Sequence, residues 1–292
     1  MKALCIHAHF DDFEFTCAGT FLRWRQKFGD DFVGKILVCT DGGAGHHELT
    51  REQTSRRREQ EQEAAAQLLG VDWELLRLPD GTVPREGMVR ADGFTVAAIW
   101  EAIRAFEPDV IFAPPLPTDP LAGVHTDHLE VAAAVRRVGY LINVPHAFLP
   151  EYPEAKEYPA RWLKTPIILV TADGYQQENQ IDLVVDVAEV FDEISAASYC
   201  HTSQIAEWLP WIARHDLTVP KNLAEWRIQL ERRYFKAAAR AGVPAGMLVE
   251  MFGVTGWGRV TTAREVDELF NGLLVPGAWS AGLERKLANW FA

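Results

Sequence analysis

The sequence predicts an α/β protein with a Rossmann-like, mostly parallel sheet flanked by helices and a mainly helical C-terminal elaboration. Over the first two-thirds of the chain, short β-rich runs alternate with helical patterns, which is typical of parallel strands joined by crossover helices. From Ala188 onward the pattern is mainly helical. With 292 residues and 48% apolar content, the chain can bury a substantial core. We expect a core over residues 1–205. We also expect an extension over residues 206–292, whose Trp-containing tail packs on the same domain.

Seven segments have the composition of strands. The first is an apolar run at the N-terminus, and the second ends where the glycine-rich sequence of residues 40–45 begins. The third precedes the turn sequence Pro79-Asp80-Gly81, and the fourth follows Pro108-Asp109. The predicted strands cover residues 2–6, 33–39, 73–78, 110–113, 166–170 and 183–187, and residues 247–252 form a returning strand.

Seven further segments have helical patterns. Gly29 ends the first of them, and Leu69-Gly70 marks the end of the second. Pro220 suits the start of the last. The predicted helices cover residues 18–28, 49–69, 94–106, 128–138, 190–200, 204–213 and 222–241.

The charge of the chain restricts its partners. A formal net charge of −12 and a pI of about 5.2 disfavour nucleic acid and anionic membrane surfaces, because both require clustered cations. No apolar stretch approaches the roughly 20 residues of a membrane span, and the start lacks the length of a secretory signal. The four cysteines form no C-x-x-C pair. We therefore expect a cytoplasmic protein with reduced cysteines that acts on a small molecule, and a homo-oligomer remains open.

The most informative segment is residues 7–14, with the sequence HAHFDDFE, directly after the first predicted strand. Aspartate is a poor strand former, and two adjacent carboxylates cost desolvation energy when buried. This segment lies where a parallel sheet delivers residues to its ligand crevice. A divalent metal is the simplest compensating charge, so the segment predicts a metal site.

A second cluster, residues 125–128 with the sequence HTDH, supports this interpretation. Catalytic zinc usually has three nitrogen or oxygen ligands from the protein and one open position for water. His9, Asp12 and one histidine of the second cluster supply such a set. Asp11 would then accept the proton of the activated water.

The two histidines of the second cluster can divide their roles. His125 and His128 are three residues apart and fall on one face if a helix begins there. One can bind metal while the other faces the substrate, stabilises an oxyanion and protonates a departing amine. Asp127 could orient one of the imidazoles.

Each of these residues alone has a simpler interpretation. A single histidine is more often an ordinary polar residue, and Asp11-Asp12 could cap the following helix. The joint occurrence of both clusters next to predicted strands favours the metal site. His46 and His47, in the glycine-rich loop, are expected to be solvent-exposed or substrate-facing rather than ligands.

The two clusters resemble the motifs of the PIG-L/LmbE family of zinc-dependent N-acetylglucosaminyl deacetylases. That family carries A-H-P-D-D-x-E after its first strand and H-x-D-H after a later strand, which residues 8–14 and 125–128 match here. The resemblance covers roughly residues 1–205. Weaker similarities are a T-x-G-x-x-G loop at residues 40–45, an R-x-x-E-x-x-x-A-x-x-x-L-G helix at 58–70, a P-D-G turn at 79–81 and an A-x-x-x-H-x-S-Q stretch at 197–204.

The resemblance implies an enzyme that removes an N-acetyl or other acyl group from an amino sugar or GlcNAc-type conjugate. The implied cofactor is Zn²⁺, with Fe²⁺ as the other candidate. The implied metal ligands are His9, Asp12 and His128, and the implied general base is Asp11. His125 would stabilise the oxyanion, Asp127 would support His125, and Arg58 and Asp80 would grip sugar hydroxyls or a phosphate-like group.

Some alternatives stay open at this point. Arg58 could form a surface ion pair with Glu61 one helical turn on, and Asp80 could simply form a turn. Phe10 replaces the proline of the family motif and could present its ring to the substrate. Rival functions are an amidase acting on a thiol conjugate, a sugar-binding relative without turnover, and a receiver-like signalling domain. The last leaves His125 and His128 without a role.

Overall fold

A computed structural model describes the chain except residues 118–121, 173–180, 214–216, 278–280 and 291–292. Its centre is a seven-stranded sheet with the order β3-β2-β1-β4-β5-β7-β6. Strands β1 to β5 run parallel, and β7 pairs antiparallel with both β5 and β6. The predicted fold class is therefore confirmed. The strands are β1 (Lys2–His7), β2 (Val33–Val38), β3 (Asp72–Leu75), β4 (Val110–Ala113), β5 (Ile167–Thr171), β6 (Leu183–Asp186) and β7 (Val249–Val254).

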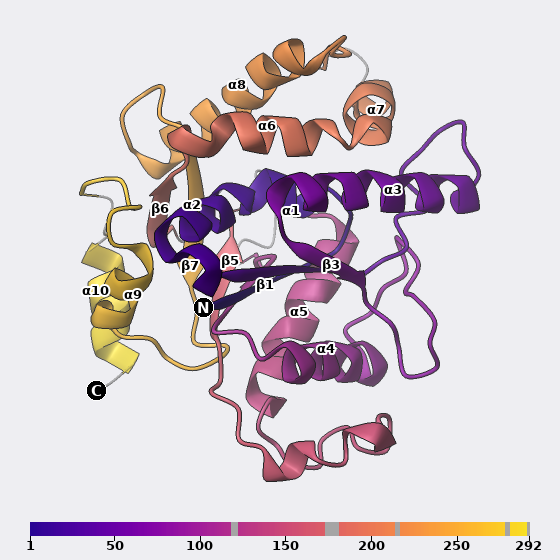
Figure 1. Ribbon diagram of the computed structural model, residues 1–292, viewed down its shortest axis with the longest axis vertical. Coiled ribbons are helices and arrows are strands. Elements are labelled where there is room, and N and C mark those ends of the chain that lie inside the picture. Colours follow the sequence, from indigo (N-terminus) through magenta and orange to yellow (C-terminus); the bar gives the residue numbers. More distant parts are fainter. Residues whose placement is uncertain (118–121, 173–180, 214–216, 278–280, 291–292) are drawn as a thin grey trace.

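Helices cover both faces of this sheet (Figure 1). α1, α2, α3, α6 and α8 lie on one face, and α4 and α5 lie on the other. A π-helical turn, Ser203–Trp208, precedes α7. The α-helices are α1 (Asp12–Thr16), α2 (Ala18–Phe28), α3 (Arg51–Leu69), α4 (Gly93–Phe106), α5 (Thr126–Leu141), α6 (Phe191–Tyr199), α7 (Leu209–Ala213), α8 (Leu223–Ala241), α9 (Ala263–Phe270) and α10 (Ala281–Trp290).

The predicted elements are present, with shifted ends. α3 begins at Arg51 because Thr50 and Gln53 form a capping box at its start. α5 begins two residues earlier than predicted, at Thr126, so that His128 lies in its first turn. β3 is shorter than predicted and ends at Leu75.

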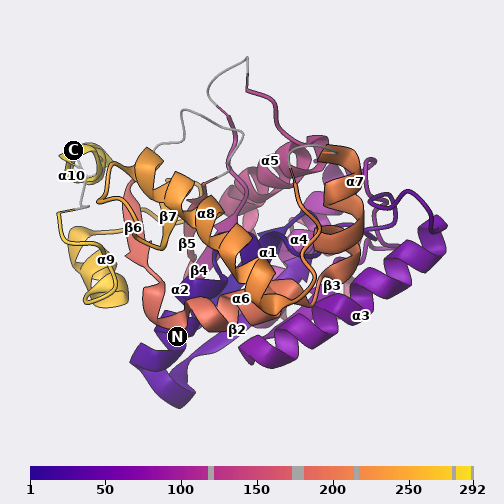
Figure 2. The same ribbon diagram turned by 90° about the horizontal axis from the view of Figure 1, so that it is seen from above.

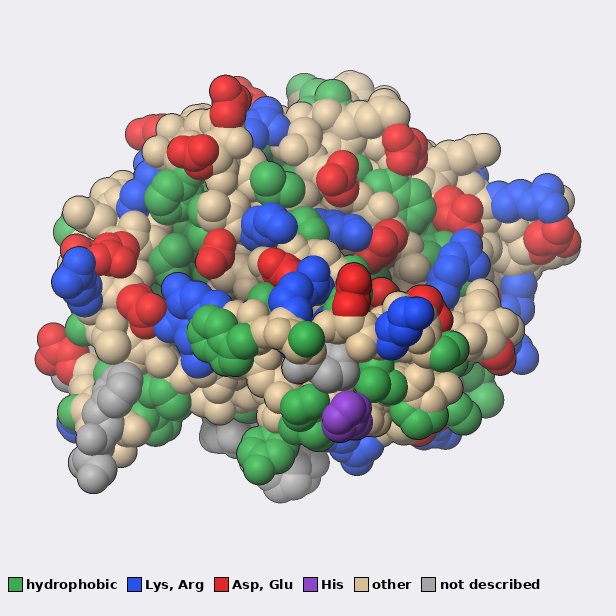
Figure 3. All heavy atoms as spheres, turned by 60° about the horizontal axis from the view of Figure 1, so that its bottom comes forward, with side chains coloured by type: hydrophobic (Ala, Val, Ile, Leu, Met, Phe, Trp, Pro, Cys, Tyr) green, Lys and Arg blue, Asp and Glu red, His purple; other side chains and the backbone are tan. Residues whose placement is uncertain are grey.

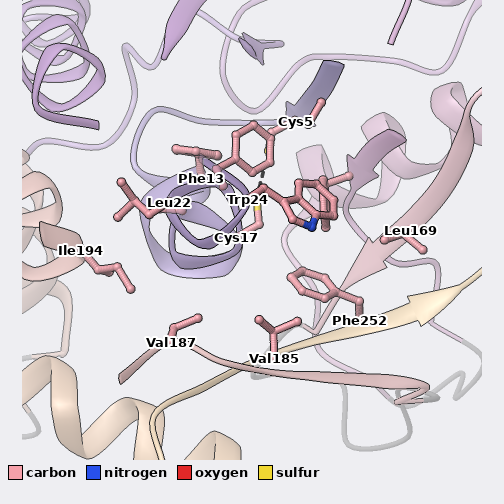
Figure 4. Close-up of a cluster of buried hydrophobic side chains, with 14 of the residues drawn as sticks. Cys5, Phe13, Cys17, Leu22, Trp24, Leu169, Val185, Val187, Ile194 and Phe252 are labelled. Carbon is pink, nitrogen blue, oxygen red and sulfur yellow. Dashed lines mark hydrogen bonds between the residues drawn. The ribbon is translucent and has the colours of Figure 1, made fainter. Parts of the chain in front are cut away.

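Side chains alternate between two cores along the strands, as a sheet covered on both faces requires. Cys5 and Phe112 belong to the core beneath α2, whereas Ile6 and Ile111 belong to the core beneath α4 and α5. Figure 4 shows the first of these cores around Trp24, with Phe252 and other side chains of the C-terminal part close by. All four cysteines are free, as predicted.

The C-terminal part contributes directly to this core. β7 supplies a strand between β5 and β6, and α9 buries Val266 and Phe270 in the same cluster as Trp24. The Trp24 indole donates a hydrogen bond to the Leu269 carbonyl at 3.0 Å. Helix α9 therefore packs against the core beneath α2.

The surface on the α4–α5 side carries mixed charge. Figure 3 shows acidic and basic side chains interspersed over this face, without a large area of one sign. Among the described residues, no helix is long and apolar enough to cross a membrane.

A buried carboxylate from β7 caps α2. The N-cap residue Cys17 offers no side-chain cap, and Glu250 instead accepts hydrogen bonds from the backbone N–H groups of Gly19 at 2.8 Å and Thr20 at 2.7 Å. The Thr20 hydroxyl donates a third, at 2.6 Å. Burial raises the pKa of Glu250 to about 7, against these hydrogen bonds.

This raised pKa predicts a pH-dependent stability. The folded state binds the Glu250 proton more tightly than the unfolded chain does, in which the pKa of this group is 4.5. The contribution of Glu250 protonation to the free energy of unfolding is therefore complete below pH 4.5 and is lost as pH rises through about 7. We expect a loss of about 3 kcal/mol in unfolding free energy across that window. Urea unfolding of wild type and Glu250→Gln over the same pH series isolates this contribution. Parallel stability curves for the two proteins would contradict it.

Candidate metal centre and active site

Both predicted clusters lie at the point where the strand order of the sheet reverses. β1 and β4 are adjacent, the chain continues from β1 outward to β2 and β3, and it continues from β4 outward in the other direction to β5. Open α/β sheets bind ligands in the crevice at this point, beyond the carboxyl ends of the strands. The first cluster follows β1 directly, and the second begins the helix that follows β4.

The first cluster is shaped by a strained turn between β1 and α1. Asp11 has a φ of 81°, a left-handed conformation that costs a non-glycine residue roughly 1–2 kcal/mol. Helix α3 holds this turn, because Arg58 Nη2 donates to the Phe10 carbonyl at 2.8 Å and Gln62 Oε1 accepts from the Asp11 N–H at 3.4 Å. The turn brings His9 back over Asp12, whose carboxylate accepts the His9 N–H at 2.8 Å.

The second cluster is set by the start of α5. His125 is the N-cap residue, and its Nδ1 accepts the N–H of Asp127 at 3.2 Å. Asp127 is fully buried in the first turn, and His128 follows it. The α5 start thereby points both side chains at the β1 cluster.

Three donor atoms from the two clusters meet with the spacing that a tetrahedral ion needs. His9 Nδ1 lies 3.2 Å from His128 Nε2, His128 Nε2 lies 3.3 Å from Asp12 Oδ2, and His9 Nδ1 lies 3.4 Å from Asp12 Oδ2. Metal–ligand bonds of about 2.0–2.1 Å in tetrahedral geometry place neighbouring donors about 3.3 Å apart. These residues could therefore hold a divalent metal without rearrangement.

His7 offers a competing set that the sequence did not single out. His7, Asp12 and His128 have potential ligand atoms within 4.8 Å of one another. His7 Nδ1, however, lies 2.6 Å from Asp12 Oδ2, which is a hydrogen-bond distance and too short for two ligands of one ion. His7 therefore fits the role of a partner that orients the Asp12 carboxylate.

The charges at this centre are strongly coupled. Burial opposes ionisation of Asp12, but His7 and His128 hold its pKa well below the usual value. Burial also opposes protonation of His9, yet Asp12 and Asp127 raise the pKa of His9 to about 9. A cation is thus strongly favoured among these groups, and a metal would compete with protons for them.

Asp11 neighbours the proposed ligands His9 and Asp12 but is not one of the three donor residues. Its carboxyl group is buried, and burial raises its pKa to about 6, although the Arg58 guanidinium 3.6 Å away opposes the shift. A carboxylate with a pKa near the working pH can both take and return a proton. A carboxyl group with this pKa is chemically able to act as the predicted base.

Asp127 lies closer to His9 than to His125, the residue that the resemblance implied as its partner. Its Oδ2 lies 3.1 Å from His9 Nε2 and accepts the Gly87 N–H at 2.7 Å, whereas His125 Nδ1 is 4.0 Å away. His125 Nδ1 instead accepts the backbone N–H of Asp127 at the start of α5. Asp127 therefore contacts His9 directly, and its support of His125 stays a prediction.

Arg58 and Phe10 also differ from the simplest expectations. Arg58 is buried, and its neighbour Arg57 makes the ion pair with Glu61, at 3.3 Å. Phe10 is fully buried beneath the Arg58 guanidinium, 5.6 Å from ring centre to cation, and packs edge-on against Trp73. Phe10 thus supports Arg58 from below and does not present its ring to a substrate.

Two further predictions on loop residues have different outcomes. Asp80 is exposed, and its carboxylate accepts two hydrogen bonds from Thr82, so the structure gives it a turn-forming role and none of its contacts reaches the cluster. The His46 side chain is buried and lies 2.8 Å from Glu207, so it is not solvent-exposed, and the alternative that it faces the substrate stays a prediction. His47 is partly exposed and stacks on Trp211.

Glu86 is a site residue that sequence reasoning missed. Its carboxylate accepts the N–H groups of Ala44 at 2.6 Å and Gly45 at 3.2 Å, and its other oxygen lies 3.5 Å from Arg58 and 3.9 Å from His9. Glu86 follows no motif and lies in an irregular segment. Only its distance from the turn sequence at residues 79–81 could have drawn attention to it.

The fold and the centre define an α/β protein with a histidine–aspartate cluster at the switch point of its sheet. Residues 4–138 match the family described as PIG-L, GlcNAc-PI de-N-acetylase, and the predicted resemblance to that family is confirmed. The match includes both motifs and rules out the receiver-like alternative. A relative from Mycobacterium sp. (strain KMS), 1D-myo-inositol 2-acetamido-2-deoxy-alpha-D-glucopyranoside deacetylase, is 27% identical over 244 residues, which cover 70% of this chain and 74% of the relative.

Solved structures share the fold at low identity. The N,N'-diacetylchitobiose deacetylase from Pyrococcus horikoshii has a TM-score of 0.60 at 19% identity and covers 88% of this chain and 84% of its own. GalB, the 4-carboxy-2-hydroxymuconate hydratase from Pseudomonas putida KT2440, has a TM-score of 0.61 at 19% identity and covers 89% of this chain and 98% of its own. The fold therefore carries more than one kind of reaction, and the function must be argued from the site.

Proposed function

We propose that this protein is a metal-dependent hydrolase that removes an N-acetyl group from an amino sugar or GlcNAc-type conjugate. The observation that carries the proposal is the triangle of His9, Asp12 and His128 donor atoms, 3.2–3.4 Å apart, with the Asp11 carboxylate beside it. The similarity to the PIG-L family and to a mycobacterial amino-sugar deacetylase supports the substrate class.

In this proposal, His9, Asp12 and His128 hold one divalent metal, with zinc favoured and iron(II) as the second candidate. When bound, such an ion lowers the pKa of water and polarises a carbonyl oxygen. The His9 ring supports the assignment, because its second nitrogen contacts the Asp127 carboxylate. Metal-binding histidines usually have such a partner, which fixes the ring tautomer and orientation.

Asp11 acts as the general base. Its carboxylate lies beside the proposed ligand Asp12 and takes the proton of the attacking water. The raised pKa of about 6 leaves it mostly ionised at neutral pH and basic enough for this transfer. The left-handed turn at Asp11, held by Gln62 and Arg58, fixes the carboxylate in place.

His125 faces the open side of the centre. Its side chain is about half exposed, at 48%, and its ring lies edge-on to the His9 ring with centres 4.6 Å apart. From there the neutral imidazole, with its proton on Nε2, donates a hydrogen bond to the oxyanion, and the proton that Asp11 took from water passes to the departing amine. The free amino sugar and acetate are the products.

Arg58 and Glu86 form the proposed sugar-binding pair. One is a buried donor and the other an acceptor, with 3.5 Å between them, so together they can serve neighbouring hydroxyls of a pyranose. Asp80, which the resemblance suggested for this role, is replaced in the proposal by Glu86.

The Glu86 assignment predicts a binding defect. Glu86→Gln keeps an oxygen for the Ala44 and Gly45 N–H groups but loses the charged acceptor, so we expect KM to rise roughly 10- to 100-fold with little change in kcat. Glu48→Gln, an exposed change in the loop that contains Ala44 and Gly45, serves as the control. A fall in kcat at constant KM would contradict the binding role.

The proposed function is tested by amine release. Purified protein is stripped with chelator, reloaded with zinc or iron(II), and assayed with fluorescamine on N-acetylated amino sugars and on thiol-conjugate amides. We expect metal-dependent release from the sugars. Release only from thiol conjugates would favour the amidase alternative, and no release from a metal-loaded protein would refute hydrolysis.

A further inference from the structure

The peptide group between Phe10 and Asp11 is held at both of its ends by α3. Arg58 Nη2 donates to the carbonyl oxygen of this peptide at 2.8 Å, and Gln62 Oε1 accepts its N–H at 3.4 Å. Arg58 and Gln62 are four residues apart, so they lie on one face of the helix. Both side chains are buried. The buried face of α3 therefore clamps a single peptide group.

This clamp fixes the backbone conformation of the proposed base. Asp11 has a φ of 81°, and turning the peptide plane over would return it to the negative φ that residues with a side chain prefer. The Asp11 carboxylate would move with its backbone. A reversed peptide would also face Arg58 with its N–H, donor against donor, and Gln62 Oε1 with its carbonyl oxygen, acceptor against acceptor. The two contacts from α3 thus oppose the rotation.

The clamp depends on which end of the Gln62 amide faces Asp11. A glutamine can present either its oxygen or its nitrogen, and only the oxygen accepts the Asp11 N–H. Glu14 Oε1 accepts Gln62 Nε2 at 2.9 Å. Because a carboxylate oxygen accepts hydrogen bonds and does not donate them, Glu14 requires the amide nitrogen on its own side. The amide oxygen is thereby directed at the Asp11 N–H.

Glu14 is held on its other side by His201. Both residues are fully buried, Glu14 in α1 and His201 shortly after α6. His201 Nε2 lies 3.4 Å from Glu14 Oε2, and in the part of the chain that the structure describes neither atom has a hydrogen-bond partner. Helix α6 packs against α1 and alongside α3 (Figure 2). Glu14 is therefore fixed between two buried side chains where three helices meet.

We infer that Glu14 is a positioning residue for the general base and acts through the Gln62 amide on the Phe10–Asp11 peptide. His201 holds Glu14, Glu14 orients Gln62, and Gln62 receives the Asp11 N–H. The catalytic consequence of this inference rests on the proposed function, in which Asp11 takes the proton of water. The clamp on the peptide does not depend on that function.

The experiment separates the acceptor of Glu14 from its bulk. Glu14→Met removes the acceptor, whereas Glu14→Gln retains an oxygen for the Gln62 amide. We expect Glu14→Met to lower kcat about ten-fold with KM and metal content unchanged, and Glu14→Gln to stay within about two-fold of wild type. Gln67→Met, an exposed change on α3 that also removes an amide bonded to a glutamate, is the matched control for Gln62→Met.

Non-additivity tests whether the residues act in series. Gln62→Met should lower kcat at least as far as Glu14→Met, and the double variant should fall no further than Gln62→Met alone. Neither change should lower the residual rate of an Asp11→Asn variant, because both act through Asp11. Additive losses, or equal losses of kcat in Glu14→Gln and Glu14→Met, would overturn the inference while leaving deacetylation intact.

Hydrogen exchange of the Asp11 amide, measured by NMR, tests the clamp without a substrate. We expect faster exchange in Glu14→Met and Gln62→Met than in wild type, and unchanged exchange in Glu14→Gln. Wild-type exchange in Glu14→Met would overturn the clamp. If wild type turns over no sugar, the proposed function fails and this measurement alone decides. If Glu14→Met does not fold, protected Gln62 side-chain amide protons in wild type support the inference, and rapid exchange of those protons overturns it.

Discussion

Asp11→Asn will abolish amine release while leaving the fold and the metal content intact. Asparagine matches aspartate in size and tolerates the left-handed conformation at φ 81°, so the turn is retained. The change removes the group that takes the proton from water, for which losses of about 10²- to 10⁴-fold in kcat are typical. Steady-state kinetics with the substrate found by the amine screen measures the loss.

The control for this variant is Asp30→Asn, an exposed carboxylate outside the centre. We expect it to match wild type in kcat, and we expect both variants to keep the wild-type metal content and melting temperature. Activity of Asp11→Asn within about ten-fold of wild type would show that another group accepts the proton.

His9→Ala will lose the metal, and His7→Gln will retain it. The donor spacing places His9 in the triangle with Asp12 and His128, whereas His7 hydrogen-bonds Asp12. Loss of one of three ligands removes the ion and, with it, several kcal/mol of transition-state stabilisation, so kcat/KM should fall by at least about 10³-fold. Metal content after dialysis, measured by mass spectrometry, distinguishes the variants.

His146→Ala, at an exposed histidine, controls for non-specific loss of metal. The reverse pattern, with metal retained by His9→Ala and lost by His7→Gln, would move the centre to the alternative set of His7, Asp12 and His128.

The arrangement of strands and helices could be predicted from the sequence because its signals are local. Apolar runs, glycine turns and helical periodicity each report on a few neighbouring residues. The predicted bounds differ from the structure at the ends of elements, because side-chain hydrogen bonds determine where a helix begins. Thr50 and Gln53 fix the start of α3, and His125 fixes the start of α5.

The candidate site could be predicted in part for the same reason. His9, Asp12 and His128 lie in two compact motifs, and the switch point of the sheet brings those motifs together. Their convergence followed from topology alone.

What the sequence could not predict depends on contacts between distant loops. Glu86 reaches the centre from an irregular segment, held by the N–H groups of Ala44 and Gly45. The Asp127 carboxylate lies closer to His9 than to His125 because of where α5 starts. Phe10 is buried because Gly42 leaves room for its ring, since a Cβ at Gly42 would lie 2.5 Å from it.

Phe10, which replaces the proline of the family motif, acts through its contact with Arg58. Phe10 supports the Arg58 guanidinium and thereby the proposed sugar-binding pair, without touching a substrate itself. Its influence on specificity would therefore act through Arg58.

An anomalous-difference map of zinc-loaded crystals locates the metal. We expect one peak at about 2.0–2.2 Å from His9 Nδ1, Asp12 Oδ2 and His128 Nε2, with Asp11 outside the ligand set. A peak bonded to His7, a peak among His9, His125 and Asp127, or no peak in zinc-loaded protein would contradict it.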